Sequence, residues 1–442
     1  MALSLERIER KEARVGVIGL GYVGLPVAIH FAEAGFVTTG FDVDPEKIRR
    51  LREGLSYIRY IPSQRVASLV ERRALTATDR FADLQAVDAI LICVPTPLTE
   101  NREPDLSFVT STVRTISRHL TPGQLVVLES TTYPGTTREV VLPLLADGGE
   151  LGGKRIVGRD FYLAYSPERE DPNNQEYSFR SIPRLVGGCT PRCAELARAL
   201  YGGVVENAIP VSSPEVAEAA KLLENVYRTV NIALVNELKL LFERMGIDVW
   251  EVIEAAKTKP FGFSAFHPGP GLGGHCIPID PFYLTWRAKK YEFPTRFIEL
   301  AGEINTAMPR HVVARVMDAL NDRGRSLRGA RVLIVGVSYK RDVDDTRESP
   351  ALTIIELLEQ KGAVVEYHDP LVPHLGSFRR HVFNKASCEL TPAVLRSFDA
   401  AIIVTDHSLV DYDLIVRESA LVVDTRNALK NVRHGREKIV KA

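Results

Sequence analysis

The stretch Arg14-Val-Gly-Val-Ile-Gly-Leu-Gly-Tyr-Val-Gly24 decides how the first third of this chain folds. Its apolar start is typical of a buried strand, and that strand leads directly into a G-x-G-x-x-G turn. A helix is expected over Leu25–Glu33, followed by a second strand over 36–41 that ends at Asp42. This order of elements, a strand, the glycine turn, a helix, a second strand and an acid, predicts a dinucleotide-binding site.

Each glycine of the turn is expected to serve a different purpose. Gly19 permits the tight turn, Gly21 lets the backbone approach a pyrophosphate, and Gly24 lets the helix pack closely on the strand. Tyr22 and Val23 lie inside the turn, so we expect them beside the cofactor. The free N–H groups at the start of the helix favour phosphate.

Asp42 follows Gly24 by 18 residues, close to the spacing of a carboxylate that binds the adenosine ribose. Such a carboxylate accepts hydrogen bonds from the ribose hydroxyls and repels a 2′-phosphate, so NAD is favoured over NADP. Lys47, on the next helix, is expected to face the same ribose. The alternative is a glycine turn that serves packing alone.

Composition excludes several classes of protein. The 442 residues carry a formal net charge of zero, so the chain lacks the excess of basic residues that is typical of nucleic-acid-binding proteins. No apolar run is long enough to cross a membrane, and the charged N-terminus lacks the apolar core of a signal peptide. Five scattered cysteines argue for a reducing cytoplasm rather than a disulfide framework, and no metal site is expected.

Two more strands end in polar residues. Runs 87–94 and 124–129 both predict buried strands, followed by Thr96 and by Ser130 and Thr131. Ligands of open α/β sheets lie beyond the carboxyl ends of the strands, so these three side chains are candidates to contact the nicotinamide or a water. Helix capping or turn formation is the alternative.

A further strand is expected over 161–165, and Glu168 follows it within Ser166-Pro-Glu-Arg-Glu-Asp-Pro172. Its position at the same edge of the sheet makes Glu168 a candidate general base. A solvated charged loop is the alternative.

Helical periodicity of apolar residues runs from Val216 to about Met245 and predicts a helix near 30 residues long. Such a helix commonly joins domains and offers a surface to a partner subunit, so a homodimer or higher oligomer is expected. Lys221 and Asn225 share one face of it. The alternative for Lys221 is an ordinary helix ion pair with Glu218 or Glu224.

The loop Phe266-His-Pro-Gly-Pro-Gly-Leu-Gly-Gly-His-Cys276 contains too many glycines and prolines for regular structure, which suggests backbone wrapped around a ligand. Cys276 lies just before an expected helix at 281–290, where the helix N-terminus and a nearby ammonium would favour the thiolate. Asp280 completes a covalent-catalysis set with Cys276 and Lys221. The alternatives are a small buried cysteine and an N-cap aspartate.

The last third of the chain repeats the pattern of the first. The matching segments are Arg331–Gly336 with Arg14–Gly19, Lys361–Pro370 with Ala34–Pro45, and Asp399–Thr405 with Asp88–Val94. Gly336 is followed by Val-Ser-Tyr-Lys340 and lacks the full glycine triplet, so this half predicts a weaker pyrophosphate site. Lys340 and Arg347 offer cations to phosphates, although a charged surface loop is the alternative.

We therefore expect an α/β protein with two Rossmann-like, doubly wound domains joined by a long central helix and a helical dimerisation region. The expected domains are 1–210 for the cofactor, 211–325 for dimerisation and the cysteine loop, and 326–442 for the second Rossmann-like pattern.

The chain resembles the UDP-glucose/GDP-mannose dehydrogenases, a family of nucleotide-sugar 6-dehydrogenases, over nearly its whole length. The motifs that carry the resemblance are Gly19-Leu-Gly-Tyr-Val-Gly24, Cys93-Val-Pro-Thr-Pro97, Glu129-Ser-Thr131, Ser166-Pro-Glu168, Glu218-Ala-Ala-Lys221-Leu-Leu-Glu-Asn225, Gly273-Gly-His-Cys276-x-x-x-Asp280 and Asp345-Thr-Arg347-Glu-Ser.

The resemblance implies that the C-terminal domain, 326–442, binds the sugar nucleotide. It also implies a four-electron oxidation of a sugar C6 alcohol to a carboxylate with two NAD, in polysaccharide biosynthesis. It implies that Cys276 forms a thiohemiacetal and then a thioester. Lys221 and Asn225 would stabilise the oxyanions, and Asp280 would orient a water or accept a proton.

The remaining implied roles belong to other segments. Thr131 would hold the water, and Glu168 would assist hydrolysis and contact substrate. Gly273 and Lys340 would also contact the substrate, and Arg347 would reach toward NAD.

One departure from the UDP-glucose branch concerns the cysteine loop. His275 and Ile279 stand where that branch usually has Ser and Lys, which looks more like enzymes that oxidise UDP-N-acetylhexosamines. UDP-N-acetylglucosamine is the first expectation, UDP-N-acetylmannosamine the second, and UDP-glucose a further alternative.

Overall fold

The computed structural model describes residues 3–99, 101–147, 153–169, 177–274, 277–376 and 382–442. The chain divides into two compact units, Met1–Glu224 with Phe282–Phe293, and Asn225–Pro281 with Pro294–Ala442. The division into three domains at 210 and 325 stays a prediction.

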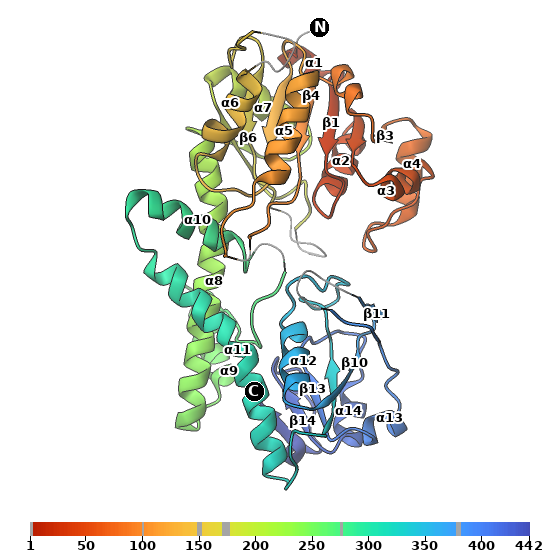
Figure 1. The fold of residues 1–442 in the computed structure, drawn as a ribbon, viewed down its shortest axis with the longest axis vertical. Helices are drawn as coiled ribbons and strands as arrows, with labels where there is room; N and C mark the ends of the chain where they lie inside the picture. The colour runs from red at the N-terminus through yellow and green to blue at the C-terminus, as the bar shows by residue number, and fades with distance from the viewer. Residues whose placement is uncertain (1–2, 100, 148–152, 170–176, 275–276, 377–381) are drawn as a thin grey trace. The chain divides into compact units, whose positions relative to one another are not determined.

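The first unit is built on an eight-stranded sheet of order β3-β2-β1-β4-β5-β6-β7-β8 (Figure 1). The strands are β1 (Arg14–Ile18), β2 (Val37–Phe41), β3 (Leu75–Thr78), β4 (Ala89–Ile92), β5 (Leu125–Leu128), β6 (Tyr162–Tyr165), β7 (Arg184–Gly188) and β8 (Ala208–Val211). All neighbouring pairs are parallel except β6 with β7. Successive strands are added on one side of β1 up to β3 and on its other side from β4 onward. A doubly wound sheet binds its ligand at this switch point between β1 and β4.

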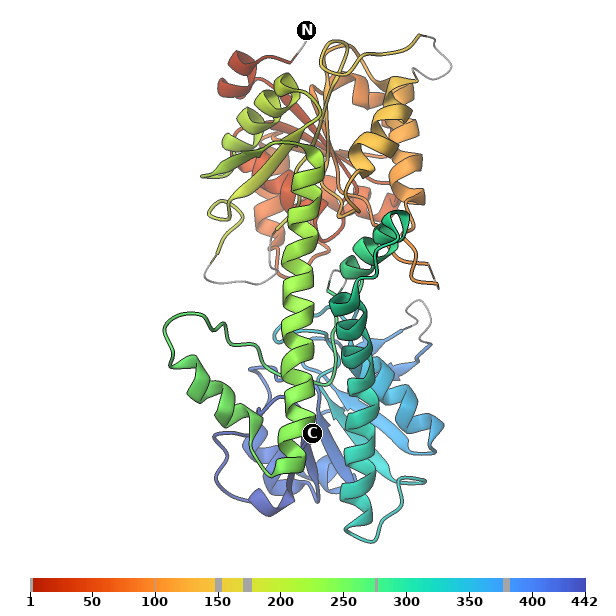
Figure 2. The same ribbon diagram turned by 90° about the vertical axis from the view of Figure 1, so that its left-hand side faces the viewer.

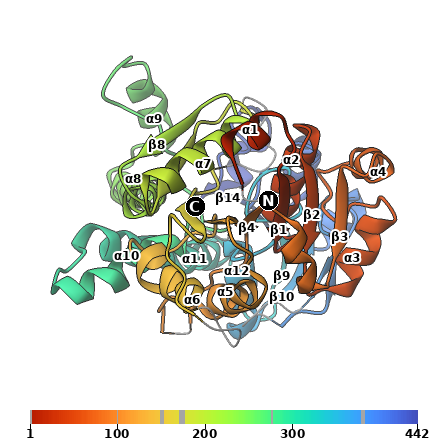
Figure 3. The ribbon, with the colours of Figure 1, turned by 90° about the horizontal axis from the view of Figure 1, so that it is seen from above.

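Helices cover both faces of this sheet, as Figure 3 shows with α2 and α7 on one side and α5 and α6 on the other. One apolar cluster joins β1 to α2 and α7, and a second joins β4 and β5 to α5. The helical segments are α1 (Leu5–Glu9), α2 (Gly24–Glu33), α3 (Pro45–Arg52), α4 (Ser63–Glu71), η1 (Phe81–Ala86), α5 (Ser107–His119), η2 (Thr137–Val141), α6 (Leu142–Ala146) and α7 (Pro191–Gly202).

Helix α8 (Pro214–Met245) confirms the long helix predicted from the sequence and is continuous over 32 residues (Figure 2). After it come α9 (Val249–Lys257), α10 (Asp280–Ala288), η4 (Lys289–Tyr291) and α11 (Arg296–Asn321). The 26-residue α11 carries Pro309 in its interior. In the part of the chain that the structure describes, no helix is long and apolar enough to span a membrane.

The second unit holds a five-stranded parallel sheet of order β10-β9-β13-β14-β15. Its elements are β9 (Arg331–Val335), α12 (Pro350–Gln360), β10 (Val364–His368), β11 (His374–Leu375), β12 (Lys385–Ala386), α13 (Pro392–Arg396), β13 (Ala400–Ile403), α14 (Tyr412–Glu418), β14 (Val422–Asp424), η5 (Arg436–Lys438) and β15 (Ile439–Lys441). Helix α12 packs on β9 and β10 through a buried apolar cluster (Figure 1). Two Rossmann-like sheets and the long helix α8 confirm the fold class predicted from the sequence.

Candidate active site

The glycine turn leaves room where a pyrophosphate would lie. Gly19 has φ +90°, which an L side chain rarely adopts. A Cβ on Gly24 would lie 1.8 Å from the carbonyl oxygen of Gly19, so only glycine permits this packing of helix on turn. A Cβ on Gly21 would meet no atom within 4 Å. The turn is therefore closed toward the protein and open on the side of Gly21, and it fits the pyrophosphate of NAD.

Asp42 follows β2 and braces the same turn. Its Oδ2 accepts hydrogen bonds from the backbone N–H of Leu20 (2.7 Å) and from Lys47 Nζ (3.2 Å), and its Oδ1 accepts from the N–H of Asp44 (3.0 Å). The carboxylate is 7% exposed. Asp42 and Lys47 therefore lie together beside the glycine turn, and their contact with a ribose stays a prediction.

In the parallel sheet β4 lies next to β1 and β5 lies next to β4, so the polar residues that follow these two strands lie at the same edge as the glycine turn. Ser130 Oγ donates to the carbonyl oxygen of Val94 at 2.7 Å, so its hydroxyl holds the two strand ends together. Thr96 is buried and its carbonyl accepts from Tyr283 Oη at 2.8 Å. Thr131 is half-buried and lies next to Ser130 in the chain.

Glu168 is part of a buried ionic cluster that the sequence reasoning did not foresee. Arg184, the first residue of β7, contacts Glu168 Oε2 at 2.7 Å and Glu129 Oε2 at 2.5 Å. Tyr201 Oη donates to the second oxygen of Glu129 at 2.5 Å. The one available signal was Glu129 itself, an acid at the end of an otherwise apolar strand.

Glu218, on α8, is buried and accepts three hydrogen bonds from the turn after β5. The donors are the backbone N–H of Gly135 (2.6 Å), the N–H of Thr137 (2.8 Å) and the Thr137 hydroxyl (2.7 Å). Burial raises the pKa of Glu218 to about 7, against these donors. The alternative of an exposed helix pair between Glu218 and Lys221 is therefore wrong, because the carboxylate faces away from solvent and fixes the turn to α8.

Lys221 is half-buried, three residues after Glu218 on α8. One turn further, Asn225 is 8% exposed and donates through Nδ2 to Asp280 Oδ2 at 2.6 Å. Asp280 is 2% exposed and is the first residue of α10. The alternative of a simple N-cap does not account for this side-chain contact, which joins two of the residues that the sequence grouped together.

Cys276 lies outside the described residues, as does His275. The segments on either side are fixed by buried polar side chains of α8. Asn236 Oδ1 accepts from the N–H of Gly269 at 2.9 Å, and Thr229 Oγ1 donates to the carbonyl of Ile277 at 3.2 Å. Asn305 Oδ1 on α11 accepts from Asn236 Nδ2 at 2.9 Å. Neither Asn236 nor Asn305 was predicted from the sequence.

Gly273 and Gly274 pack against the loop that follows β9. A Cβ on Gly273 would lie 2.7 Å from Tyr339 Cβ, and the N–H of Gly274 donates to the carbonyl of Arg347 at 3.0 Å. Arg347 forms a two-pronged ion pair with Asp345, with Nη2 at 2.6 Å from Oδ2. Lys340, in the same loop, is half-buried.

The loop with Lys340 is held by a buried histidine. His407 Nδ1 accepts from the N–H of Asp342 at 3.0 Å, so the ring proton lies on Nε2, 3.1 Å from Asp369 Oδ2. Ser338 Oγ contacts the same Nε2 at 2.9 Å, which is not the geometry of a nucleophilic triad. Asp369 also accepts from the N–H of Val337 at 2.7 Å. It therefore occupies the position that Asp42 has in the first unit, whereas the matched segments Lys361–Pro370 and Ala34–Pro45, which both end in Asp-Pro, suggested Asp44 as its counterpart.

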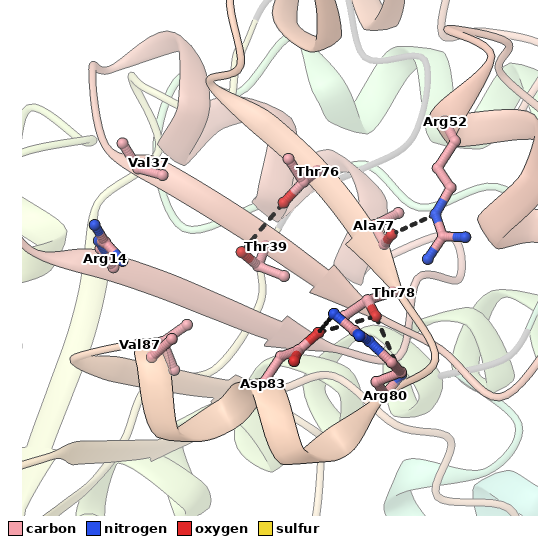
Figure 4. A pocket seen from close by; sticks show the side chains of 11 residues that line it. Arg14, Val37, Thr39, Arg52, Thr76, Ala77, Thr78, Arg80, Asp83 and Val87 are labelled. Atoms are coloured by element: carbon pink, nitrogen blue, oxygen red, sulfur yellow. Dashed lines mark hydrogen bonds and ion pairs between the residues drawn. The ribbon is translucent and has the colours of Figure 1, made fainter.

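A separate cavity of about 290 Å³ lies on the face of β1, β2 and β3 (Figure 4). Its lining includes Arg14 and Val37, the first residues of β1 and β2, and the hydroxyls of Thr39 and Thr76 contact each other at 3.3 Å. Since Gly19 follows the opposite end of β1, this cavity is not the predicted cofactor site.

Comparison with known proteins agrees with this geometry. Three models of the UDP-glucose/GDP-mannose dehydrogenase family match the chain, namely its NAD binding domain over residues 13–205, its central domain over 215–307 and its UDP binding domain over 333–431.

Two curated relatives are similar over most of their length. The UDP-N-acetyl-D-glucosamine 6-dehydrogenase of Pseudomonas aeruginosa is 38% identical over 82% of this chain and 84% of its own. The UDP-N-acetyl-D-mannosamine dehydrogenase of Pyrococcus horikoshii is 35% identical over 94% of this chain and 96% of its own.

Among solved structures, UDP-D-ManNAc dehydrogenase from Pyrococcus horikoshii superposes with a TM-score of 0.86 and 34% identity, covering 97% of this chain and 98% of that one. With the glycine turn, the acid after β2 and two Rossmann-like sheets already established, the chain belongs to the UDP-glucose/GDP-mannose dehydrogenase family of NAD-dependent nucleotide-sugar dehydrogenases.

Proposed function

We propose that this enzyme oxidises the C6 alcohol of a UDP-N-acetylhexosamine to the carboxylate in a four-electron reaction through a covalent thioester on Cys276. The observation that carries the proposal is the Asn225–Asp280 hydrogen bond of 2.6 Å. Both side chains are buried, and Asp280 lies four residues after Cys276 in the chain. A thioester mechanism needs a thiol and fixed hydrogen-bonding groups around the reacting carbon. The Asn225–Asp280 pair is a fixed polar pair of this kind, and it supports the proposal through its short separation from Cys276 in the chain.

Bound NAD would supply the hydride acceptor, and a fresh NAD would be needed for each of the two oxidations. The Cys276 thiolate would attack the C6 aldehyde, and Lys221 and Asn225 would donate hydrogen bonds to the oxyanion that forms. After the second oxidation, water would attack the acyl carbon and the thiolate would leave. Asp280 would orient that water or take a proton, because its carboxylate is held by Asn225.

Glu168 would act as the base of hydrolysis, and Thr131 would hold the water. Glu168 is the most exposed member of its ionic cluster, with 13% of its side chain accessible, so it is the member that can meet a water or a substrate. Thr131 follows Ser130, whose hydroxyl fixes the ends of β4 and β5. Lys221, Gly273 and Lys340 would complete the contacts to the substrate.

The cofactor would lie along the glycine turn. The backbone at Gly19, Gly21, Tyr22, Val23 and Gly24 would receive the pyrophosphate. The Asp42 carboxylate, held by Lys47, would bind the ribose hydroxyls and select NAD against NADP.

Further cofactor contacts are proposed for the edge of the sheet and for the second unit. Thr96, Ser130 and Thr131 follow strands that end beside the glycine turn, and Arg347 would supply a cation.

The acetamido sugar is proposed from the cysteine loop and from the names of the relatives. The relatives of Pseudomonas aeruginosa and Pyrococcus horikoshii carry the names of different epimers, N-acetylglucosamine and N-acetylmannosamine. His275 and Ile279 in the cysteine loop support an N-acetylhexosamine over glucose, by resemblance. We place UDP-N-acetylglucosamine first and UDP-N-acetylmannosamine second, with UDP-glucose as the alternative.

We also propose a homodimer through α8. This helix exposes a row of large apolar side chains at heptad spacing, namely Tyr227, Leu234 and Leu241, with Leu223 and Met245 beside it. A self-complementary apolar stripe of this kind is typical of an interface between two copies. Light scattering should give the mass of a dimer, and Leu234→Glu with Leu241→Glu should give a monomer.

The substrate is tested by mixing the enzyme and NAD with a panel of UDP- and GDP-sugars and following NADH by absorbance. The proposal expects the highest kcat/KM with UDP-N-acetylglucosamine and no turnover with GDP-mannose. Preference for UDP-N-acetylmannosamine would change the epimer and leave the chemistry, whereas preference for UDP-glucose would refute the assignment to N-acetylhexosamines.

A further inference from the structure

The connection between α3 and α4, residues 53–62, contacts the glycine turn of the first unit through two tyrosines (Figure 1). Tyr57 Oη donates to the carbonyl oxygen of Leu20 at 2.5 Å. Tyr60 Oη makes a longer contact of 3.4 Å with the carbonyl oxygen of Tyr22. The connection therefore reaches the carbonyl groups of the two residues that flank Gly21.

The connection is itself held in place around Tyr57. Ile58 and Ile61 are 2% and 3% exposed and belong to the apolar cluster that joins β1 to α2. The Ser56 hydroxyl accepts from the N–H of Ile58 at 3.1 Å, and Arg50 Nη2 donates to the carbonyl of Ser56 at 2.5 Å. Since the residues on both sides of Tyr57 are fixed, its hydroxyl has a fixed position against the turn.

Leu20 is held through both of its backbone groups. Its N–H donates to Asp42 Oδ2 at 2.7 Å, and its carbonyl accepts from the Tyr57 hydroxyl. Burial raises the pKa of Tyr57 above its usual value, and the charge of Asp42 adds to this, so the hydroxyl stays protonated and remains a donor. Two consecutive peptide units of the turn are therefore each fixed by one side chain.

This contact determines the direction of the Gly21 N–H. A trans peptide unit is planar, and its C=O and N–H point in opposite directions. Because the Leu20 carbonyl points toward Tyr57, the N–H of Gly21 points away from it. Within the residues that the structure describes, this N–H has no acceptor, and a Cβ on Gly21 would meet no atom within 4 Å. The same residue thus combines an available donor with open space beside it.

We propose that Tyr57 is a positioning residue for the dinucleotide, because its hydroxyl turns the Leu20–Gly21 peptide so that the Gly21 N–H faces the pyrophosphate. Backbone N–H groups of such a turn are the donors that bind phosphate. A hydrogen bond accepted by the carbonyl also strengthens the N–H of the same peptide as a donor. Tyr57 acts through the backbone of Leu20, and the inference rests on the proposed position of the cofactor along the glycine turn.

The test measures the binding of two fragments of the cofactor to wild type and to Tyr57→Phe by isothermal titration calorimetry. ADP-ribose contains the pyrophosphate, whereas adenosine contains only the base and the ribose that Asp42 is proposed to bind. Tyr57→Phe keeps the ring and removes the donor. We expect the dissociation constant of ADP-ribose to rise about fivefold or more, the effect of losing one ordinary hydrogen bond. That of adenosine, measured by competition against ADP-ribose, should stay unchanged.

The matched control is Thr38→Val, which removes another buried hydroxyl of the first unit that donates to a carbonyl. Its partner is the carbonyl of Phe36 at 3.2 Å, near the start of β2 and at the opposite end of this strand from Asp42. This variant should leave both dissociation constants unchanged. Equal affinity of Tyr57→Phe and wild type for ADP-ribose would overturn the inference. An equal loss for ADP-ribose and adenosine would also overturn it, because the effect would then not concern the pyrophosphate.

Initial rates with the best sugar of the panel give a second readout. Loss of a contact that is the same in the ground state and the transition state raises the KM for NAD and leaves kcat unchanged. A Tyr57→Phe enzyme with a lower kcat and an unchanged KM for NAD would contradict the inference.

Asp42→Ala separates a failure of the inference from a failure of the proposed cofactor position. This variant should weaken the binding of both fragments. If it weakens neither, the cofactor does not lie along the glycine turn, and the inference fails with that proposal. If Asp42→Ala weakens both and Tyr57→Phe weakens neither, only the role of Tyr57 is wrong.

Discussion

Lys239 on α8 is a buried ammonium without a hydrogen-bond acceptor in the part of the chain that the structure describes. It is 5% exposed. The acid one helical turn further on, Glu243, is already paired with Arg315 at 2.7 Å and with His311 at 3.4 Å. A buried charge without a partner is destabilising, so we expect removal of this ammonium to stabilise the second unit.

The magnitude follows from the titration of the group. Burial lowers the pKa of Lys239 from 10.5 to about 8. A difference of about 2.5 pH units corresponds to roughly 3 kcal/mol between the two protonation states. The pKa is lower in the folded state than in the unfolded one. The folded state is therefore free of the penalty above 10.5, and this stability is lost as pH falls through about 8, where the buried amine becomes charged. Wild type therefore carries the penalty at pH 7 and is relieved of it as pH rises through 8 to 10.5.

Lys239→Met removes the charge and keeps the length of the side chain. At pH 7 it should raise the free energy of unfolding by about 3 kcal/mol, and the gain should shrink as pH approaches 10.5. Of the two tryptophans, Trp250 lies in the second unit and Trp286 in the first. Fluorescence during urea unfolding in a Trp286→Phe background, at one protein concentration, therefore reports the second unit alone.

The matched control is Lys257→Met, because the Lys257 side chain is 58% exposed. It should change stability by less than about 0.5 kcal/mol at any pH. Equal stability of Lys239→Met and wild type at pH 7, or a gain that does not depend on pH, would refute the reasoning.

Three further predictions concern the site. Asn236→Ala removes the acceptor of the Gly269 N–H. It should lower kcat at least tenfold and change the rate at which iodoacetamide alkylates Cys276. If both rates are unchanged, Asn236 does not position the cysteine loop. Asp42→Ala should raise the KM for NAD more than tenfold in initial-rate assays, and an unchanged KM would remove Asp42 from the ribose site. Glu218→Ala leaves three donors unpaired and should destabilise the first unit by about 3 kcal/mol in calorimetry, whereas a loss below about 0.5 kcal/mol would show that water replaces the carboxylate.

Much of the fold could be predicted because strands and glycine turns are local features. The apolar run Arg14–Ile18 is β1 with the same limits, and the helix expected from Val216 to Met245 is α8. Asp42 was predicted beside the glycine turn because the distance along a βαβ unit is nearly fixed. Such features depend on residues close together in sequence.

The polar contacts of the site could not be predicted because they join residues far apart in sequence. Glu129 and Arg184 are 55 residues apart, as are Asn225 and Asp280, and Asn236 and Asn305 are 69 apart. Each of these side chains is also common on exposed surfaces, so its type gives no sign of burial. For this reason Glu218 was named only as a partner of Lys221 in the alternative interpretation, and its burial was not predicted.

The central claim is four-electron oxidation through Cys276, and the ratio of NADH formed to UDP-sugar consumed tests it most directly. With limiting UDP-N-acetylglucosamine and excess NAD, the proposed chemistry predicts two NADH and one uronic acid per sugar, and a Cys276→Ala enzyme should form no acid. One NADH per sugar, or unchanged acid production by Cys276→Ala, would contradict it.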